Sequence, residues 1–331
     1  MDALVPEPYR EEYMSGTVRA LAGLVATLAL LFTMAGGGGE VPSANAAKKT
    51  PSPTPTVGPT PTPPPIPAGL RAGLRASNYG ITPFPSPTWW VSSTQSMAAR
   101  FPSSAPEQLA VVVEVAGGSG RNGCWAHFPQ PATGTWPNVT WDDIDLFEST
   151  FDAFDGAGVK VWLQVEPAKC DVPMLIDLMY LQYGHHPSVI GFGVDDEWYR
   201  KDLVRYGKPI TDAEAAAWVA KTRSYHAEDL VLVKHWLPEK MPPTYRDGLV
   251  FVDDSQGLGS LDAMVSEFSV WGQAFDPAPV GFQYGYASDK NWWSGLADPP
   301  RDIGNALLSA IPNTRDLIWV DFTAYDIWPA E

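Results

Sequence analysis

The feature of this sequence that most constrains its fold is a set of eight short apolar runs within residues 76–320, separated by polar or amphipathic stretches. The runs are rich in Val, Ile, Phe and Trp and mostly lack strict alternation, which is typical of strands buried on both faces. They are Ala76–Ile81, Leu109–Val115, Val159–Val165, Val189–Val194, Leu230–His235, Leu249–Val252, Val280–Tyr284 and Leu317–Val320.

Amphipathic stretches between the runs predict helices. They are Trp141–Phe154, Val172–Tyr183, Asp212–Tyr225, Leu261–Phe275 and Asp302–Ile311. Asp212 with Glu214 resembles an acidic helix start, and so does Thr140 before Trp141 and two aspartates. Eight strands with intervening helices over about 260 residues predict a (β/α)₈ barrel. A doubly wound open sheet is the alternative, and the absence of a glycine-rich phosphate loop after the first runs disfavours its nucleotide-binding form.

The first 46 residues predict export from the cytoplasm. Ala20 to Ala35 carries no charge and follows Arg10 and Arg19, while Ala44-Asn45-Ala46 resembles a small-residue cleavage site. Residues 1–46 are therefore either a cleaved signal peptide or an uncleaved membrane anchor. Both alternatives place the rest of the chain outside the cell or at its surface, with membrane contact through this segment only.

A stiff linker follows the export segment at residues 47–67. Pro51 to Pro67 is dominated by Pro and Thr, which favours polyproline II and excludes a packed core. At ~3.1 Å per residue, this stretch reaches roughly 50 Å. We expect it to hold one domain, residues 68–331, away from the membrane.

Net charge and aromatic content indicate which classes of binding partner to expect. The net charge of −16 disfavours phosphate backbones, so we expect no nucleic acid. Fourteen Trp is a high count, and exposed aromatic rings stack well on the apolar face of a sugar. We therefore expect a polysaccharide or glycan as the substrate. We also expect the protein to be a monomer and to need no cofactor.

In a barrel of this kind, the reaction takes place where the strands end. Polar residues at these ends, in chain order, are Glu114, Glu166, Asp195, Asp196, Glu197, His235, Asp253, Asp254, Gln283 and Asp321. Several carboxylates at one mouth repel one another, which raises the pKa of at least one. A carboxyl group that stays protonated near neutrality is the general acid that glycosidic-bond cleavage needs.

The segment from Ile190 to Tyr199 resembles the fourth-strand signature of glycoside hydrolase family 18, the chitinase-like enzymes, whose pattern is D-G-x-D-x-D-x-E. Asp195 and Glu197 match the last two acidic positions, while Ile190 and Gly193 stand in place of the first two aspartates. The resemblance implies that Glu197 is the acid/base and Asp195 its orienting partner, with a substrate acetamido oxygen as nucleophile.

The same resemblance extends to two other strands. Gln283-Tyr284 is similar to a Gln/Tyr pair that some of those enzymes place near the substrate N-acetyl group. Trp319 resembles the Trp that forms the floor of their −1 subsite. In the sequence next to Glu197, Trp198 and Tyr199 are placed to frame a sugar.

A second resemblance also selects Glu197. His186 to Gly191 reads H-P-S-V-I-G and is similar to the segment H-P-S-V-I-G-W-x-x-x-N-E of the large retaining clan of cellulases, mannanases and β-galactosidases. That segment carries the acid/base Glu of the clan. Asp196 stands where the clan has Asn, and Gln283 stands near the place of its nucleophile on the seventh strand.

These patterns predict an extracellular glycoside hydrolase with Glu197 as general acid/base, tuned by Asp195 and Asp196. Glu166 or Asp253 would supply a second carboxylate. The residues expected to bind sugar are Trp198, Tyr199, His235, Trp236, Gln283, Tyr284 and Trp319. The alternative is a catalytically inactive carbohydrate-binding or envelope scaffold barrel, which Gly193 and Gln283 favour. A third possibility is a structural protein that binds a cation at its acidic mouth.

Cysteines and histidines complete the site predictions. Cys124 and Cys170 follow neighbouring strands, so we expect a disulfide between them in an oxidising compartment. The five His show no HExxH spacing, and we expect no metal. His185-His186 is expected to cap the preceding helix. A metal hydrolase that uses His235, Asp253 and Asp254 is the less favoured reading.

Overall fold

The computed structural model describes residues 69–101, 107–116 and 123–330. The predicted export segment and the Pro-rich linker lie outside these residues. In the part of the chain that is described, no helix is long and apolar enough to cross a membrane.

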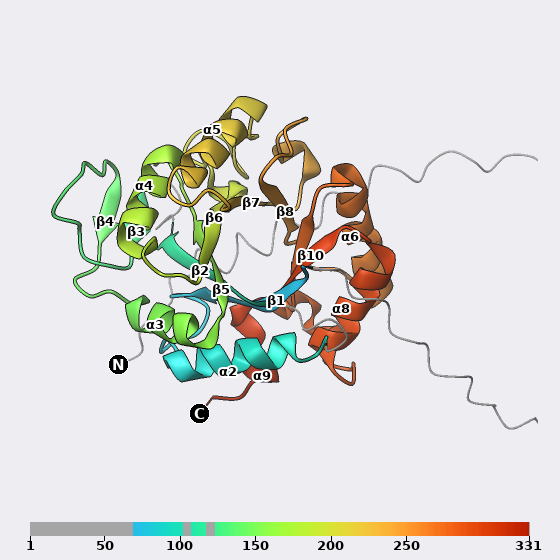
Figure 1. The fold of residues 1–331 in the computed structure, drawn as a ribbon. Coiled ribbons are helices and arrows are strands. Elements are labelled where there is room, and N and C mark those ends of the chain that lie inside the picture. Colours follow the sequence, from blue (N-terminus) through green and yellow to red (C-terminus); the bar gives the residue numbers. More distant parts are fainter. Residues whose placement is uncertain (1–68, 102–106, 117–122, 331) are drawn as a thin grey trace, which may run out of the picture. The chain divides into compact units, whose positions relative to one another are not determined.

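Eight parallel strands form a closed ring, because β1 pairs with both β10 and β2 (Figure 1). The strands are β1 (Arg71–Ser77), β2 (Glu107–Ala116), β5 (Lys160–Val165), β6 (Val189–Asp195), β7 (Leu230–Lys234), β8 (Leu249–Asp253), β9 (Val280–Tyr284) and β10 (Thr314–Trp319). All eight predicted runs overlap these strands. The closed parallel barrel is thus confirmed, and the open doubly wound sheet is excluded.

Helices surround the ring in alternation with the strands (Figure 1). They are α2 (Pro87–Ala98), α3 (Glu148–Ala157), α4 (Val172–Tyr183), α5 (Asp212–Arg223), α6 (Leu261–Phe275), α7 (Lys290–Trp293), α8 (Pro299–Ala310) and α9 (Ala324–Ile327). The start of α5 is a capping box in which the side chains of Thr211 and Glu214 satisfy each other's backbone amides, as the acidic start predicted. Between β7 and β8 the regular structure is one 3₁₀ turn, η2 (Pro238–Lys240).

Two predicted elements differ from the structure. The first strand is Arg71–Ser77 and not 76–81, because a strand with two arginines does not read as apolar. The Arg71 Nε lies 2.6 Å from an Asp316 oxygen. The predicted helix at 141–154 begins only at Glu148, since Thr140 lies in a short strand, β4 (Val139–Trp141). That strand pairs with β3 (Cys124–Ala126) beside the end of β2.

Two hydrophobic clusters show which way each strand residue points. The smaller cluster fills the inside of the ring and consists of Leu109, Val111, Trp162, Leu232, Val250, Val252 and Ile318. The larger cluster lies between the strands and the helices and includes Phe251, Phe282 and Trp319. Because side chains alternate along a strand, Lys234 and Asp254, two positions after the inner residues Leu232 and Val252, face the mouth of the barrel.

Candidate active site

At the ends of the strands, a group of charged and polar side chains continues the inward-facing rows. We call these residues the mouth cluster: Arg75, Glu166, Asp195, Glu197, Lys234, Asp254, Gln283 and Tyr286. Each of them is at most 9% exposed. Six of the eight carry carboxylates or cations that act on one another's pKa, so the cluster is an electrostatic unit.

Lys234 lies at the centre of the mouth cluster. Its Nζ is 2.7 Å from an oxygen of Asp195 and 2.8 Å from an oxygen of Asp254, and the side chain is 1% exposed. Burial lowers the pKa of Lys234, but the two carboxylates raise it more, and the net result is a pKa well above the ordinary value. Lys234 therefore stays charged and compensates the two aspartates.

Glu197 follows Asp195 in the 3₁₀ turn η1 (Asp196–Trp198) at the end of β6. Burial, and then the charge of Asp195, raise the pKa of Glu197 to about 8. Lys201 opposes this effect, with its Nζ 3.5 Å from the Glu197 Oε1. Glu197 is therefore protonated at neutral pH, and its carboxyl group can donate a proton to a bound substrate.

Glu166 directly follows β5 and has a second raised pKa. Burial and the charge of Asp195 raise it to about 7, while a hydrogen bond from Tyr79 acts in the opposite direction. The Tyr79 hydroxyl donates to the Glu166 Oε1 at 2.5 Å. Near neutrality Glu166 exchanges its proton readily, so it can act as a base while Glu197 still holds its proton.

Asp321 is engaged in a closed ion pair at the side of the mouth. The Arg75 Nε donates to its Oδ1 at 2.9 Å, and the backbone amide of Ser77 donates to its Oδ2 at 2.7 Å. This pair orders the end of β1 next to the end of β10. We therefore treat Asp321 as a structural partner of Arg75.

Asp253 and Asp196 lie outside the mouth cluster. Asp253 continues the outward row of Phe251, and its Oδ1 accepts a hydrogen bond from the Ser255 amide at 2.8 Å. The neighbouring residue Asp254 faces inward in its place. Asp196 is fully buried, and among the described residues neither of its carboxylate oxygens has a hydrogen-bond partner. Burial, and then Asp195, raise its pKa well above the ordinary value.

Two of the predicted sugar-binding aromatics belong to the outer core. Trp319 is 0% exposed and makes edge-to-face contacts with Tyr284 and Trp293 at ring-centroid distances of 5.5 and 5.3 Å. The Tyr284 hydroxyl donates to the Pro300 carbonyl oxygen. Both side chains point away from the mouth, so neither one can form the floor of a sugar subsite there.

Tyr199 and His235 are also turned outward. The Tyr199 hydroxyl donates to Glu214 on α5, and its ring packs edge-to-face on Trp218. His235 is 0% exposed, and its Nε2 lies 3.0 Å from the Tyr206 carbonyl oxygen. With both His235 and Asp253 outside the mouth, the structure does not assemble the alternative metal site of these two residues with Asp254.

Three predicted sugar-binding residues remain near the mouth. The ring of Trp198 lies under the Lys201 ammonium, with Nζ 3.6 Å from the ring centroid. Trp236 is half-buried and contacts Tyr206 edge-to-face. Gln283 faces inward, and its Nε2 donates to the Tyr286 hydroxyl.

Four residues in or next to the mouth cluster were not predicted as site residues from the sequence: Lys234, Arg75, Tyr79 and Tyr286. The signal for Lys234 was present, because it lies two positions after Leu232 in a run that is otherwise apolar. The signal for Arg75 was hidden, since the predicted start of the first strand came after it. Tyr79 and Tyr286 lie in loops after strands, where no periodicity indicates direction.

Gly193 lies on the inner face of β6, opposite Gln164 on β5. A Cβ atom at position 193 would lie 3.1 Å from both the Cα and the Cβ of Gln164, which is tighter than ordinary van der Waals contact. A side chain at this position requires Gln164 to move. The structure thus gives a steric reason for glycine where the chitinase-like pattern has aspartate.

Cys124 on β3 and Cys170 before α4 are both buried and both free. The Cys124 Sγ donates to the Pro167 carbonyl oxygen at 2.9 Å. Burial, and then a hydrogen bond with Cys170, raise the pKa of the Cys124 thiol. The two thiols are thus neighbours, and the disulfide between them stays a prediction.

No protein-family model matches the chain, and no curated protein matches it. Among solved structures it is similar to the FMN-binding β-glucuronidase of Facaelibacterium prausnitzii, with TM-score 0.45, 13% identity and coverage of 76% of this chain and 38% of that one. A β-glucuronidase of Parabacteroides merdae gives TM-score 0.43, 11% identity and coverage of 76% and 31%. The xylanase and α-amylase inhibitor protein of Scadoxus multiflorus gives TM-score 0.41, 10% identity and coverage of 78% and 94%.

The chain spans only about a third of the length of these β-glucuronidases. The distant structural similarity thus extends to β-glucuronidases and to an inhibitor protein alike. The closed pairing of the strands defines the fold, and the geometry of the mouth cluster defines the candidate site.

Proposed function

We propose that this barrel is a glycoside hydrolase in which Glu197 is the general acid. The supporting observation is a carboxyl group at the end of β6 that is buried, faces the mouth and has a pKa of about 8. Such a group is protonated at neutral pH and gives its proton to the oxygen of the leaving sugar as the glycosidic bond breaks. Asp195 is the positioning residue, since its charge keeps the proton on Glu197.

Glu166 is the proposed second carboxyl group. Its pKa of about 7 lies below that of Glu197, so the pair is poised with one group ionised and the other protonated. In the proposed reaction, Glu166 takes a proton from water, the water oxygen bonds to the anomeric carbon, and Glu197 protonates the departing oxygen. Gln283 on β9 supports this choice, because an amide cannot serve as a carboxylate nucleophile.

The test is the release of reducing sugar from a panel of polysaccharides by the wild type and by Glu197→Gln. We expect the variant to lose about 10²–10⁴-fold in rate. Glu228→Gln removes an exposed carboxylate before β7, so it is the charge-matched control and should retain full activity. An active Glu197→Gln protein would refute the proposed role.

A carbohydrate-binding barrel without catalysis is the second candidate. It is favoured by Gly193, which leaves the chitinase-like acidic row incomplete, and by Gln283, which is already engaged with Tyr286. Such a protein would migrate more slowly in gels that contain its polysaccharide. Neither the wild type nor Glu197→Gln would release sugar. Binding without release by the wild type would select this candidate.

We further propose that the barrel acts outside the cell on its Pro-rich stalk. The uncharged segment Ala20 to Ala35 and the linker support this location. Fractionation of expressing cells should place the full chain in the envelope or the medium, and a chain that begins at residue 47 should stay in the cytoplasm. An equal distribution of both forms would contradict export.

A further inference from the structure

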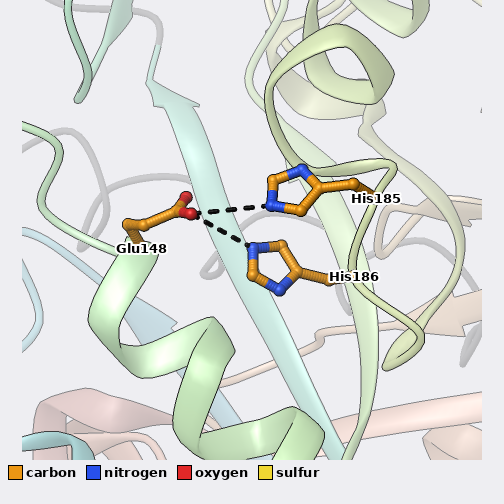
Figure 2. A group of neighbouring side chains, drawn as sticks. All are labelled: Glu148, His185 and His186. Atoms are coloured by element: carbon orange, nitrogen blue, oxygen red, sulfur yellow. Dashed lines mark ion pairs between the residues drawn. The ribbon is translucent and has the colours of Figure 1, made fainter.

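A second group of ionisable side chains lies at the other end of β6 from Glu197. Glu148 is the first residue of α3, and His185 and His186 lie in the turn between α4 and β6. Because this turn precedes β6, it lies on the side of the barrel where the strands begin. Figure 2 shows the Glu148 carboxylate extending from its helix toward both imidazole rings.

The separations in this group suit a shared cation better than direct hydrogen bonds. The Glu148 Oε1 is 3.6 Å from the His185 Nε2 and 3.7 Å from the His186 Nε2 (Figure 2). Hydrogen bonds of this type are roughly 2.7–3.2 Å long. Around a tetrahedral Zn²⁺ with bonds of ~2.0–2.1 Å, adjacent ligand atoms lie about 3.3 Å apart. All three ligand atoms lie within 4.8 Å of one another, so small side-chain movements suffice.

His186 is held as a metal ligand usually is. Its side chain is 2% exposed, and its Nδ1 lies 2.7 Å from an oxygen of Asp155. The backbone amide of Ser188 donates to the other Asp155 oxygen at 3.0 Å, which holds this carboxylate in place. A carboxylate at Nδ1 fixes the tautomer that leaves the Nε2 lone pair free for a metal.

The Nε2 atom of His186 is the observation that points to a ligand. It is buried, it points toward Glu148, and among the described residues it has no hydrogen-bond partner. One oxygen of Glu148, Oε2, also has no partner there. A buried polar atom without a partner costs stability, so this arrangement calls for an occupant.

We propose that Glu148, His185 and His186 bind a divalent transition metal, with Zn²⁺ as the ion that two imidazoles and one carboxylate select. The side chains of His185 and Glu148 are 61% and 42% exposed, which leaves an entry path and a fourth position for water. The ion joins α3 to the turn before β6. This site is structural and is independent of the glycoside hydrolase proposal.

The test is calorimetric titration of ZnCl₂ into the chelator-treated protein, prepared without a polyhistidine tag. We expect one equivalent to bind, and the melting temperature to rise when it does. His185→Ala and Glu148→Gln should each weaken the Kd by at least about tenfold and abolish the rise. Both side chains are exposed, so these variants should fold, and circular dichroism checks this.

The matched control is His226→Ala, which removes another exposed imidazole, one that pairs with Asp229. Its affinity and its melting shift should equal those of the wild type. Absence of saturable binding would overturn the proposal. Equal affinity in His185→Ala, or equal loss in His226→Ala, would also overturn it.

Discussion

Replacement of Glu197 by Gln tests the central electrostatic feature of the mouth without a known substrate. The pKa of this carboxyl group is about 8 in the fold, against an ordinary value of 4.5. Between these two pH values the folded chain keeps a proton that the unfolded chain releases. The free energy of unfolding should therefore decrease as pH rises from about 4.5 to about 8.

The size of this effect follows from the shift. One pKa unit corresponds to about 1.36 kcal/mol, so a shift from 4.5 to about 8 costs on the order of 4–5 kcal/mol once Glu197 is ionised. Gln is similar in size and does not ionise, so the variant lacks this cost. We expect equal stability at pH 5 and a gain of several kcal/mol for Glu197→Gln at pH 9.

The assay is urea unfolding followed by tryptophan fluorescence at several pH values from 5 to 9. Glu228→Gln is the control, and its stability should follow the wild type at every pH. If the difference between Glu197→Gln and the wild type is the same at pH 5 and pH 9, Glu197 does not titrate with a raised pKa. Glu197 would then be ionised at neutral pH and could not serve as the general acid.

Four further predictions concern single side chains. Tyr79→Phe removes a hydrogen bond that lowers the pKa of Glu166, so that pKa should rise above about 7. Carbon NMR of the Glu166 carboxyl group measures this pKa, and an unchanged value would contradict the role of the hydrogen bond. Lys234→Met leaves two buried carboxylates uncompensated and should cost about 3–5 kcal/mol in urea unfolding, while a loss under ~1 kcal/mol would contradict the central ion pairs. Trp319→Ala should cost about 3–5 kcal/mol as a core truncation. Trp236→Ala should weaken carbohydrate binding in affinity electrophoresis with little loss of stability, and the reverse pattern would place Trp319 in the sugar site.

The barrel was predictable because its strands are buried on both faces. Runs such as Val189–Val194 and Val280–Tyr284 coincide with β6 and β9 almost residue for residue. The first strand was misplaced because Arg71 and Arg75 are neutralised by partners 245 and 246 positions away. No local pattern reveals charges that are paired at such separations.

The site was predictable in part, and the errors are mostly of one position. Glu166, Asp195 and Glu197 were predicted for the mouth and lie there, because they continue inward-facing rows, whereas Asp196 does not. Asp253 and His235 were chosen where Asp254 and Lys234 face the mouth. The side chain that faces the mouth is the one that continues the inward row of Leu232 on β7 or of Val252 on β8. The sequence alone does not show which of two neighbouring polar residues continues that row.

The contact between Gly193 and Gln164 constrains how this chain can change over generations. An aspartate at 193 would complete one more position of the chitinase-like acidic row, yet on its own it would force apart two adjacent backbones. A smaller side chain at 164 would relieve only part of this contact, because the Cα of residue 164 itself lies 3.1 Å from the added Cβ. Any substitution of Gly193 therefore requires a small shift of the β5 backbone at Gln164, which favours retention of the glycine.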